Sequence, residues 1–353
     1  MRALCFEHHG GTENLAVVGR RTPQPGPGEV LVDLRAAALN HLDLFVLQGL
    51  PGIPIALPHV GGADGAGVVA ATGEGVGGWQ TGDEVIFNPG LSCGGCEFCR
   101  RGEECLCPRF GIVGEHTDGT LTEAIVVPAA NLARRPQHLS WAESAAMPLT
   151  FLTAWRMLVT RGRLASGETV LIHGIGGGVA LAALTIAKAL GASAIVTSSS
   201  TEKLGRARTL GADAGIDFTA SDVTAEVKAL TAKRGVDLVV ETVGEATWMA
   251  SLRAARRGGR IVTCGATSGP NPREEIRLIF WNQLSILGST MGSQEEWRRM
   301  VAFVEERQVR PVIDSILPLE RGREAYERLR AGKQFGKLVL DVVADSGSGV
   351  GEA

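Results

Sequence analysis

The fold of this chain is decided by the stretch Thr169-Val170-Leu171-Ile172-His173-Gly174-Ile175-Gly176-Gly177-Gly178-Val179-Ala180. It begins as an apolar, β-branched run, which is typical of a buried strand, and continues into an alanine-rich helical pattern that reaches Leu190. A glycine-rich turn between the two lets backbone N–H groups approach a pyrophosphate at the positive end of the helix. Because the turn stands in a strand–turn–helix unit, it predicts a dinucleotide site, which we assign to Gly174, Gly176, Gly177, Gly178 and Val179.

The sequence around this turn alternates apolar strands with helices from Gly167 to about Thr290. Such alternation predicts a doubly wound parallel sheet that is buried on both faces. From Met1 to about Val127, short apolar runs are instead separated by turn residues, which predicts a mostly β region. We therefore expect an α/β fold with a dinucleotide-binding domain at 151–290 and a second domain at 1–150 that is completed by 291–353.

Composition excludes several classes of partner. The 353 residues are 44% hydrophobic and 21% charged, which is ordinary for a globular protein of two domains. A formal net charge of -3 is not typical of nucleic-acid-binding proteins, which are usually basic. The chain has no run of about eighteen apolar residues uninterrupted by charge, so we expect no membrane span. The partner expected from the sequence is a small-molecule substrate.

Several cysteines gather in one short loop, at Cys93, Cys96, Cys99, Cys105 and Cys107. Closely spaced thiolates suit a structural zinc ion, whose four coordination positions are all filled by protein. Cys105 and Cys107 compete for the place of the fourth ligand, and we favour Cys107. An iron–sulfur cluster is the rival, but ferredoxin-type runs place the last cysteine closer to the third. Disulfides are disfavoured because a chain without a secretory leader is expected in the reducing cytoplasm.

The choice of dinucleotide depends on the end of the second strand of the alternating region. An NAD enzyme usually carries a carboxylate there, which binds the ribose hydroxyls. This chain has hydroxyls instead, at Ser198 and Ser199, and Lys203 follows on the next helix. These donors favour NADP(H) over NAD(H), because a 2′-phosphate would meet no repulsion. Arg206 and Arg208, further along, are better explained as a solvated helix face.

The chain resembles the medium-chain dehydrogenase/reductase superfamily, which includes zinc alcohol dehydrogenases and quinone oxidoreductases. The resemblance runs over nearly the whole length and rests on the cysteine loop, the glycine turn and the motifs at 61–69, 118–124, 241–244 and 335–340. It implies a GroES-like β domain, a Rossmann domain and substrate bound in the cleft. It further implies contacts with the cofactor for a set of residues after the later strands and near the C-terminus, namely Val243, Gly244, Cys264, Gly265, Ala266, Thr290 and Lys337.

The chain departs from this family where zinc alcohol dehydrogenases carry the ligands of a catalytic zinc. Asn40, Ala63 and Leu149 stand at those three places. An amide is a poor substitute for a thiolate, and methyl and isobutyl groups donate no electrons to zinc. A substitute site built from His41, His59 and Asp64 is an alternative, although histidines in a β domain are more often ordinary polar residues. We expect the chain to lack a catalytic zinc.

Without that ion, hydrogen-bond donors must stabilise the charge that develops on the substrate oxygen. Reduction of a conjugated C=C places the charge on an enolate, which demands less of the protein than an alkoxide does. We assign Asn40 as donor and His41 as a proton relay, because an unperturbed imidazole titrates near neutrality. Asp43, Asp64 and Thr153 are further candidates, and each also has a structural explanation, such as a turn cap for Asp64.

Three functions remain open on the sequence. The first is an NADP(H)-dependent reductase of enones, quinones or related carbonyls, with a structural zinc only. The second is an alcohol dehydrogenase with an atypical catalytic metal. The third is an NADPH-binding sensor or interaction protein with little turnover. As in relatives, pairing of the strand near 284–289 with a second copy would give a homodimer or homotetramer.

Overall fold

The computed structural model describes residues 1–50 and 52–343 and divides into two compact units. The first unit consists of Met1–Leu149 and the chain from Ser293 onward, and the second is Thr150–Gly292. Residues 344–353, which the sequence assigns to the first domain, lie outside the described residues. No helix in the described part of the chain is both long and apolar enough to cross a bilayer.

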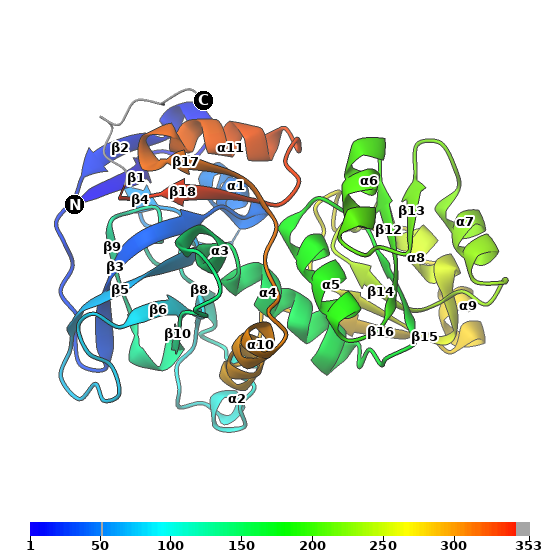
Figure 1. Ribbon diagram of the computed structural model, residues 1–353, viewed down its shortest axis with the longest axis horizontal. Helices are drawn as coiled ribbons and strands as arrows, with labels where there is room; N and C mark the ends of the chain where they lie inside the picture. The colour runs from blue at the N-terminus through cyan, green and yellow to red at the C-terminus, as the bar shows by residue number, and fades with distance from the viewer. Residues whose placement is uncertain (51, 344–353) are drawn as a thin grey trace. The chain divides into compact units, whose positions relative to one another are not determined.

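The first unit is built on β-sheets (Figure 1). Its largest sheet has the strand order β10-β6-β5-β3-β18-β17, and β9 also pairs with β3. A second sheet has the order β2-β1-β4, and β7 pairs with β8. The strands are β1 (Arg2–Phe6), β2 (Ala16–Gly19), β3 (Glu29–Ala38), β4 (His59–Val60), β5 (Asp64–Thr72), β6 (Glu84–Phe87), β7 (Gly90–Leu91), β8 (Gly111–Ile112), β9 (Ala124–Pro128), β10 (Leu132–Arg134), β17 (Ile313–Pro318) and β18 (Lys337–Asp341).

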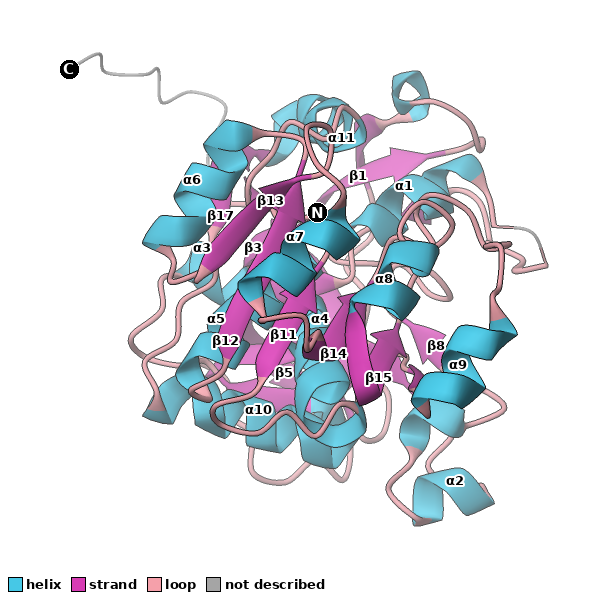
Figure 2. Ribbon diagram, turned by 90° about the vertical axis from the view of Figure 1, so that its right-hand side faces the viewer, coloured by secondary structure: helices cyan, strands magenta, loops and turns pink. Residues whose placement is uncertain are grey.

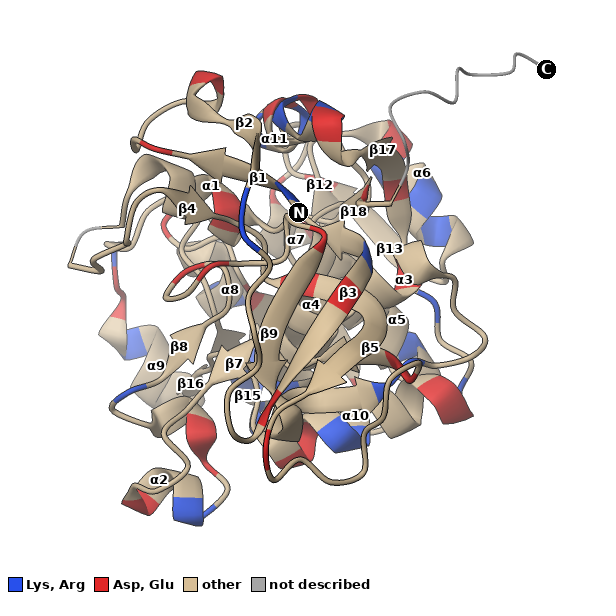
Figure 3. Cartoon of the chain, turned by 90° about the vertical axis from the view of Figure 1, so that its left-hand side faces the viewer, with Lys and Arg blue, Asp and Glu red and all other residues tan. Residues whose placement is uncertain are grey.

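Chain segments far apart in sequence meet in this unit. β18 pairs antiparallel with β3, so Val339 lies opposite Ala38 at the end of β3. β5 pairs along the other side of β3 and brings Asp64 opposite the same Ala38. The helices of the unit are α1 (His41–Gln48), α2 (Glu97–Arg100), α3 (Trp141–Ala145), α10 (Gln294–Glu306) and α11 (Gly322–Arg330), and α4 (Pro148–Trp155) begins here and continues into the second unit. Figure 3 shows acidic and basic residues interspersed on α2, α10 and α11.

The second unit is a parallel sheet with the strand order β13-β12-β11-β14-β15-β16. α5 and α6 lie on one face of the sheet, and α7, α8 and α9 lie on the other (Figures 1 and 2). The elements are β11 (Thr169–Ile172), α5 (Gly178–Ala189), β12 (Ser193–Ser198), α6 (Thr201–Thr209), β13 (Ala214–Asp217), α7 (Val223–Leu230), β14 (Val236–Glu241), α8 (Trp248–Ala254), β15 (Ala255–Thr263), α9 (Ile276–Asn282) and β16 (Ser285–Gly288).

This arrangement confirms the predicted α/β fold with its doubly wound sheet. The chain runs outward from β11 through β12 to β13 and then returns to β14 on the other side of β11. The carboxyl ends of β11 and β14 therefore flank the switch point at which open α/β sheets bind ligands. Helix α8 ends at Ala254 because Ala255 already pairs with Val236 as the start of β15.

Candidate active site and metal centre

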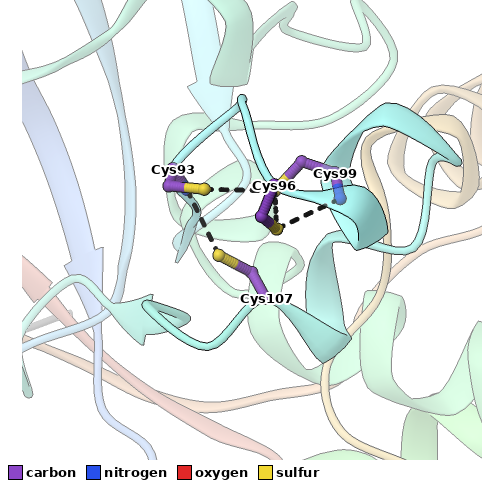
Figure 4. A group of neighbouring side chains, drawn as sticks. All are labelled: Cys93, Cys96, Cys99 and Cys107. Atoms are coloured by element: carbon purple, nitrogen blue, oxygen red, sulfur yellow. Dashed lines mark hydrogen bonds between the residues drawn. The ribbon is translucent and has the colours of Figure 1, made fainter.

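Four cysteine sulfurs converge in the loop that carries α2 (Figure 4). The Sγ atoms of Cys93, Cys96, Cys99 and Cys107 all lie within 4.8 Å of one another. The Sγ atom of Cys99 is 3.4 Å from that of Cys96 and 3.8 Å from that of Cys93. A tetrahedral zinc ion with Zn–S bonds of about 2.3 Å requires sulfurs about 3.8 Å apart, so the four thiols fit such an ion. Cys105 is not part of the group.

Backbone donors around the sulfurs favour their thiolate forms. Cys107 Sγ accepts hydrogen bonds from the N–H groups of Cys93, at 3.4 Å, and Arg109, at 3.3 Å. The N–H of Gly95 and the side chain of Arg109 lower the pKa of Cys93 to about 5. Metal ligands must be deprotonated, so the donors that favour these thiolates also favour the binding of a cation.

The glycine turn after β11 leaves room for a ligand against the backbone. Gly174 and Gly176 have φ angles of 67° and 118°, a region that side chains disfavour, and Gly177 caps α5. A Cβ atom on Gly174 would lie 3.7 Å from Val243 Cγ2, so the loops after β11 and β14 are neighbours. Gly244 has a φ angle of 91°, and a Cβ atom on it would lie only 3.0 Å from Ala266 Cα. The carboxyl edge of the sheet thus brings together the expected cofactor residues of the second unit, with Cys264 and Gly265 after β15 and Thr290 after β16.

A buried polar network connects the glycine turn with the loop after β14. Glu241 accepts hydrogen bonds from the N–H groups of Val243, at 2.8 Å, and Gly244, at 3.0 Å. Ser251 Oγ donates to Glu241 at 2.6 Å and lies 3.1 Å from His173 Nε2. Since the serine hydroxyl has only one proton, His173 Nε2–H must be the donor of the second bond. Burial lowers the pKa of His173, and although Glu241 opposes this effect, the ring stays neutral.

The other ring nitrogen of His173 completes the network. His173 Nδ1 lies 3.3 Å from Thr197 Oγ1, and the same hydroxyl accepts from the N–H of Gly174 at 3.3 Å. The patterns used to interpret the sequence did not point to this network. Its signal was Glu241, a carboxylate directly after the apolar residues Leu238, Val239 and Val240, since buried charges are rare unless they are hydrogen-bonded.

The end of β12 carries hydroxyl groups. Ser198 Oγ accepts from the N–H of Ser200 at 3.1 Å, and Ser200 caps α6 through the N–H of Lys203. Ser199 is exposed. The first carboxylate after β12 is Glu202, which belongs to the first turn of α6. The expected ribose-binding residues Ser198, Ser199 and Lys203 thus follow one another around the N-terminus of α6.

In the first unit, a buried lysine stands among the positions where zinc alcohol dehydrogenases carry ligands. Lys337 Nζ donates to Asn40 Oδ1 at 2.5 Å and to Asp64 Oδ2 at 2.8 Å. Asn40 Nδ2 donates to Asp64 Oδ2 at 2.9 Å. Lys337, Asn40 and Asp64 are 4%, 6% and 0% exposed. We call these three residues the lysine cluster.

Leu149 and Ala63, which stand at the other two ligand positions of the family, adjoin Asp64 of the lysine cluster. Asp64 Oδ1 accepts from the N–H of Leu149 at 2.7 Å, at the start of α4. Ala63 is the fully buried neighbour of Asp64. All three departures from the family pattern therefore surround one carboxylate whose charge is balanced by Lys337. The resemblance implied a cofactor contact for Lys337, whereas the structure pairs its ammonium with Asp64.

Asp43 supports the lysine cluster through the backbone. Its carboxylate accepts from the N–H of Asn40 at 2.6 Å and from the N–H of Gly62 at 2.7 Å, so it fixes the residues that precede α1 and β5. Burial raises the pKa of Asp43 to about 6, against the opposing effect of these two bonds. His41, at the start of α1, has a pKa that is lowered by desolvation and by the charge of Lys337. A neutral imidazole is therefore favoured beside the cluster.

Two other candidates lie elsewhere. Thr153 belongs to the second unit and donates to Met291 Sδ at 3.7 Å, as a packing residue would. His59 is buried against Phe6 and contacts the carbonyl of Gly114 at 3.0 Å through Nε2. Among the described residues, only the four cysteines bring metal-ligating atoms together, and His41, His59 and Asp64 do not form such a group.

Comparisons with known proteins agree with these two units. Residues 26–137 match the alcohol dehydrogenase GroES-like domain, and residues 178–306 match the zinc-binding dehydrogenase domain. A solved structure titled NAD-dependent alcohol dehydrogenase is 48% identical, has a TM-score of 0.92, and matches over 97% of this chain and 100% of its own.

Curated proteins match over similar lengths. A zinc-type alcohol dehydrogenase-like protein of Schizosaccharomyces pombe is 35% identical over 97% of this chain and 99% of its own. An acryloyl-coenzyme A reductase of Metallosphaera sedula is 33% identical over 96% of this chain and 99% of its own. A GroES-like unit joined to a Rossmann sheet defines a class of dehydrogenases. This chain belongs to the medium-chain dehydrogenase/reductase superfamily, the family of the zinc-type alcohol dehydrogenases, and is an NAD(P)-dependent oxidoreductase, as predicted.

Proposed function

We propose that this enzyme reduces a conjugated C=C or an activated carbonyl and uses the ammonium group of Lys337, in place of a zinc ion, to polarise the substrate oxygen. The proposal rests on the number of protons at Lys337 Nζ. An ammonium group has three N–H donors. Two are directed at Asn40 Oδ1 and Asp64 Oδ2, and the third has no partner among the residues that the structure describes. That donor is free for an oxygen of the substrate.

The electrostatics of the lysine cluster suit this role. Reduced nicotinamide, when bound, supplies the hydride. Negative charge then develops on the substrate oxygen, and a fixed positive charge stabilises it most where water is excluded. Asp64 holds the ammonium in place and lies almost completely away from solvent. Because Asn40 accepts from Lys337 and donates to Asp64, its amide orients both partners, which differs from the direct donor role expected from the sequence.

Metal binding is assigned to the cysteine loop alone. We propose that Cys93, Cys96, Cys99 and Cys107 hold one structural zinc, since four thiolates leave no position for substrate. At the lysine cluster, an amide, a methyl group and an isobutyl group replace the ligands of the family, and the one carboxylate is neutralised by Lys337. This set of donors does not suit zinc.

We propose NADP(H) as the preferred cofactor, because hydroxyls and Lys203 follow β12 where a carboxylate would reject a 2′-phosphate. The relative titled NAD-dependent makes a direct comparison of the two cofactors necessary. The acryloyl-coenzyme A reductase relative supports a conjugated C=C as the substrate class. Alcohol oxidation is the second candidate, and the names of the alcohol dehydrogenase relatives favour it.

Two further features complete the proposal. We propose a homodimer or homotetramer, because β16 is the outer strand of its sheet and Trp281, just before it, is 72% exposed. We also place the enzyme in the cytoplasm, because a cysteine loop that binds zinc must remain reduced.

The test compares substrate turnover with cofactor binding. The double variant K337M/D64N removes both charges of the buried pair and so avoids an unpaired carboxylate. We expect its kcat for an enone to fall by about 100-fold to 1000-fold, the usual effect of losing an oxyanion donor. The dissociation constants of NADPH and NADH, measured by fluorescence titration, should stay within about threefold of the wild type, as in K333M, which changes an exposed lysine in the turn before β18.

Two outcomes would contradict the proposal. If NADPH binding weakens while kcat is retained, Lys337 is a cofactor residue, as the family resemblance implied. If metal analysis finds two zinc ions per chain, and removal of one abolishes turnover without unfolding, the enzyme is a metal-dependent alcohol dehydrogenase.

A further inference from the structure

A strongly basic pocket lies in the second unit, apart from the cofactor residues. It has a volume of about 530 Å³ and is lined by six cationic side chains from α7, α8 and the segments next to them. We call it the basic pocket, and its cations are Lys228, Lys233, Arg234, Arg253, Arg256 and Arg257. The volume is in the usual range for small-molecule sites.

The basic pocket is at the opposite edge of the sheet from the glycine turn. Gly235, which lines it, immediately precedes β14, and Ala255 is the first residue of β15. Val243 and Gly244, by contrast, follow the carboxyl end of β14. Six residues of strand separate the two ends, which corresponds to about 20 Å at about 3.3 Å per residue. A dinucleotide held by the glycine turn does not account for the pocket.

One buried carboxylate orients two of the arginines. Asp237, which is 2% exposed, accepts from Arg234 Nη2 at 2.6 Å and from Arg256 Nε at 2.5 Å. Arg234 Nη1 binds the second oxygen of the same carboxylate at 2.9 Å. Burial alone would raise the pKa of Asp237, but the hydrogen bonds and charge of the two arginines hold it well below its usual range. The two guanidinium groups are therefore fixed before any ligand arrives.

The other four cations have no anionic partner. Lys228, Lys233, Arg253 and Arg257 are exposed, and none makes a side-chain ion pair or hydrogen bond within the part of the chain that the structure describes. Like charges held around one concavity repel one another, and a bound anion relieves that repulsion. The chain as a whole has a net charge of -3, so the excess of positive charge is local.

The lining also defines the chemistry of the ligand. Guanidinium groups bind phosphate oxygens in pairs, and six cations exceed the charge of a single phosphate group. Only two of the lining residues, Ala255 and Leu278, have apolar side chains. We propose that the basic pocket binds a small anion that carries two or more phosphate groups, at the same time as the cofactor.

The proposal is tested by calorimetric titration of the full chain with inorganic triphosphate, after saturation with NADPH so that the glycine turn is filled. The variant R253Q/R257Q removes two exposed charges whose side chains make no hydrogen bond or ion pair with the described residues. R299Q/R330Q is the matched control, since it removes two exposed arginines elsewhere in the chain. We expect one site per chain, binding at least about tenfold weaker in R253Q/R257Q and unchanged within about twofold in R299Q/R330Q.

Three results would contradict the proposed binding site. The first is no saturable binding to the wild type at about 1 mM triphosphate. The second is an equal loss of affinity in both variants, which would indicate general attraction to surface charge. The third is inorganic phosphate binding as tightly as triphosphate, which would contradict the requirement for several phosphate groups. Retained NADPH binding and an unchanged circular dichroism spectrum verify that each variant is folded.

Discussion

The cysteine loop and the lysine cluster occupy the same unit and are built in opposite ways. The cysteine ligands lie within residues 93–107, are mostly half-exposed, and surround a space that fits a metal ion. The lysine cluster joins Lys337 to residues 297 and 273 positions away, is buried throughout, and places an ammonium group among former ligand positions. On the function proposed above, the cysteine loop would hold a metal ion for structure, and the lysine cluster would supply the cation for catalysis.

The largest effect is expected from the removal of one thiolate from the cysteine loop. We expect C99S to lose its bound zinc and to unfold at a temperature lower by about 10 °C or more, because metal binding contributes directly to the stability of such loops. C105S is the matched control, since Cys105 lies outside the ligand group, and it should keep both metal and stability. Metal analysis and differential scanning calorimetry provide the measurements. Loss of metal from C105S together with its retention in C99S would require a different ligand set.

The next largest effect concerns the stability of the lysine cluster. K337M leaves the carboxylate of Asp64 buried without its counterion, which should cost about 3–5 kcal/mol in the free energy of unfolding. K337M/D64N should recover most of that loss, since no charge remains and the N–H of Leu149 can still bind the residue 64 carbonyl. Urea denaturation of the two variants measures the difference. Equal stability of K337M and the wild type would show that the pair is not buried in solution.

A third prediction concerns the pH dependence of the free energy of unfolding that results from Asp43. The pKa of Asp43 is about 6 in the folded chain, above the usual 3.8 of the group, so the folded state binds this proton more tightly than the unfolded state does. The contribution to stability is therefore fully present below about pH 4 and is lost as the pH rises through about 6, by up to about 3 kcal/mol. Subtracting the profile of D43N from that of the wild type should isolate this slope. A difference that is flat between pH 4 and 7 would contradict the raised pKa.

The contrast between the two sites also explains what could be predicted from the sequence. Strand β11, the glycine turn and the four cysteines follow from residues close together in the chain, where spacing and periodicity carry the information. The replacement of the family's zinc ligands by Asn40, Ala63 and Leu149 is local information of the same kind. The partner of Asp64 could not, because the pairing of β18 and β5 with β3, which brings residues 337 and 64 together, depends on strand register across the whole unit.

The smallest expected effect concerns the hydrogen bonds of Glu241, which connect the loops that we expect to hold the cofactor in the second unit. In E241Q, the amide nitrogen replaces one acceptor oxygen of Glu241, so at least one of the bonds from Val243, Gly244 or Ser251 is lost. Such a loss costs about 1–2 kcal/mol, and it should raise the dissociation constant of NADPH about tenfold. The kcat at saturating NADPH should stay within about twofold, because the network contacts the loops that hold the cofactor and not the lysine cluster. S251A removes the bond from Ser251 to Glu241 and the link to His173 but keeps both backbone bonds to Glu241, so it should give a smaller change in the same direction. If E241Q instead lowers kcat and leaves NADPH binding unchanged, Glu241 acts on the chemistry and not on the cofactor loops.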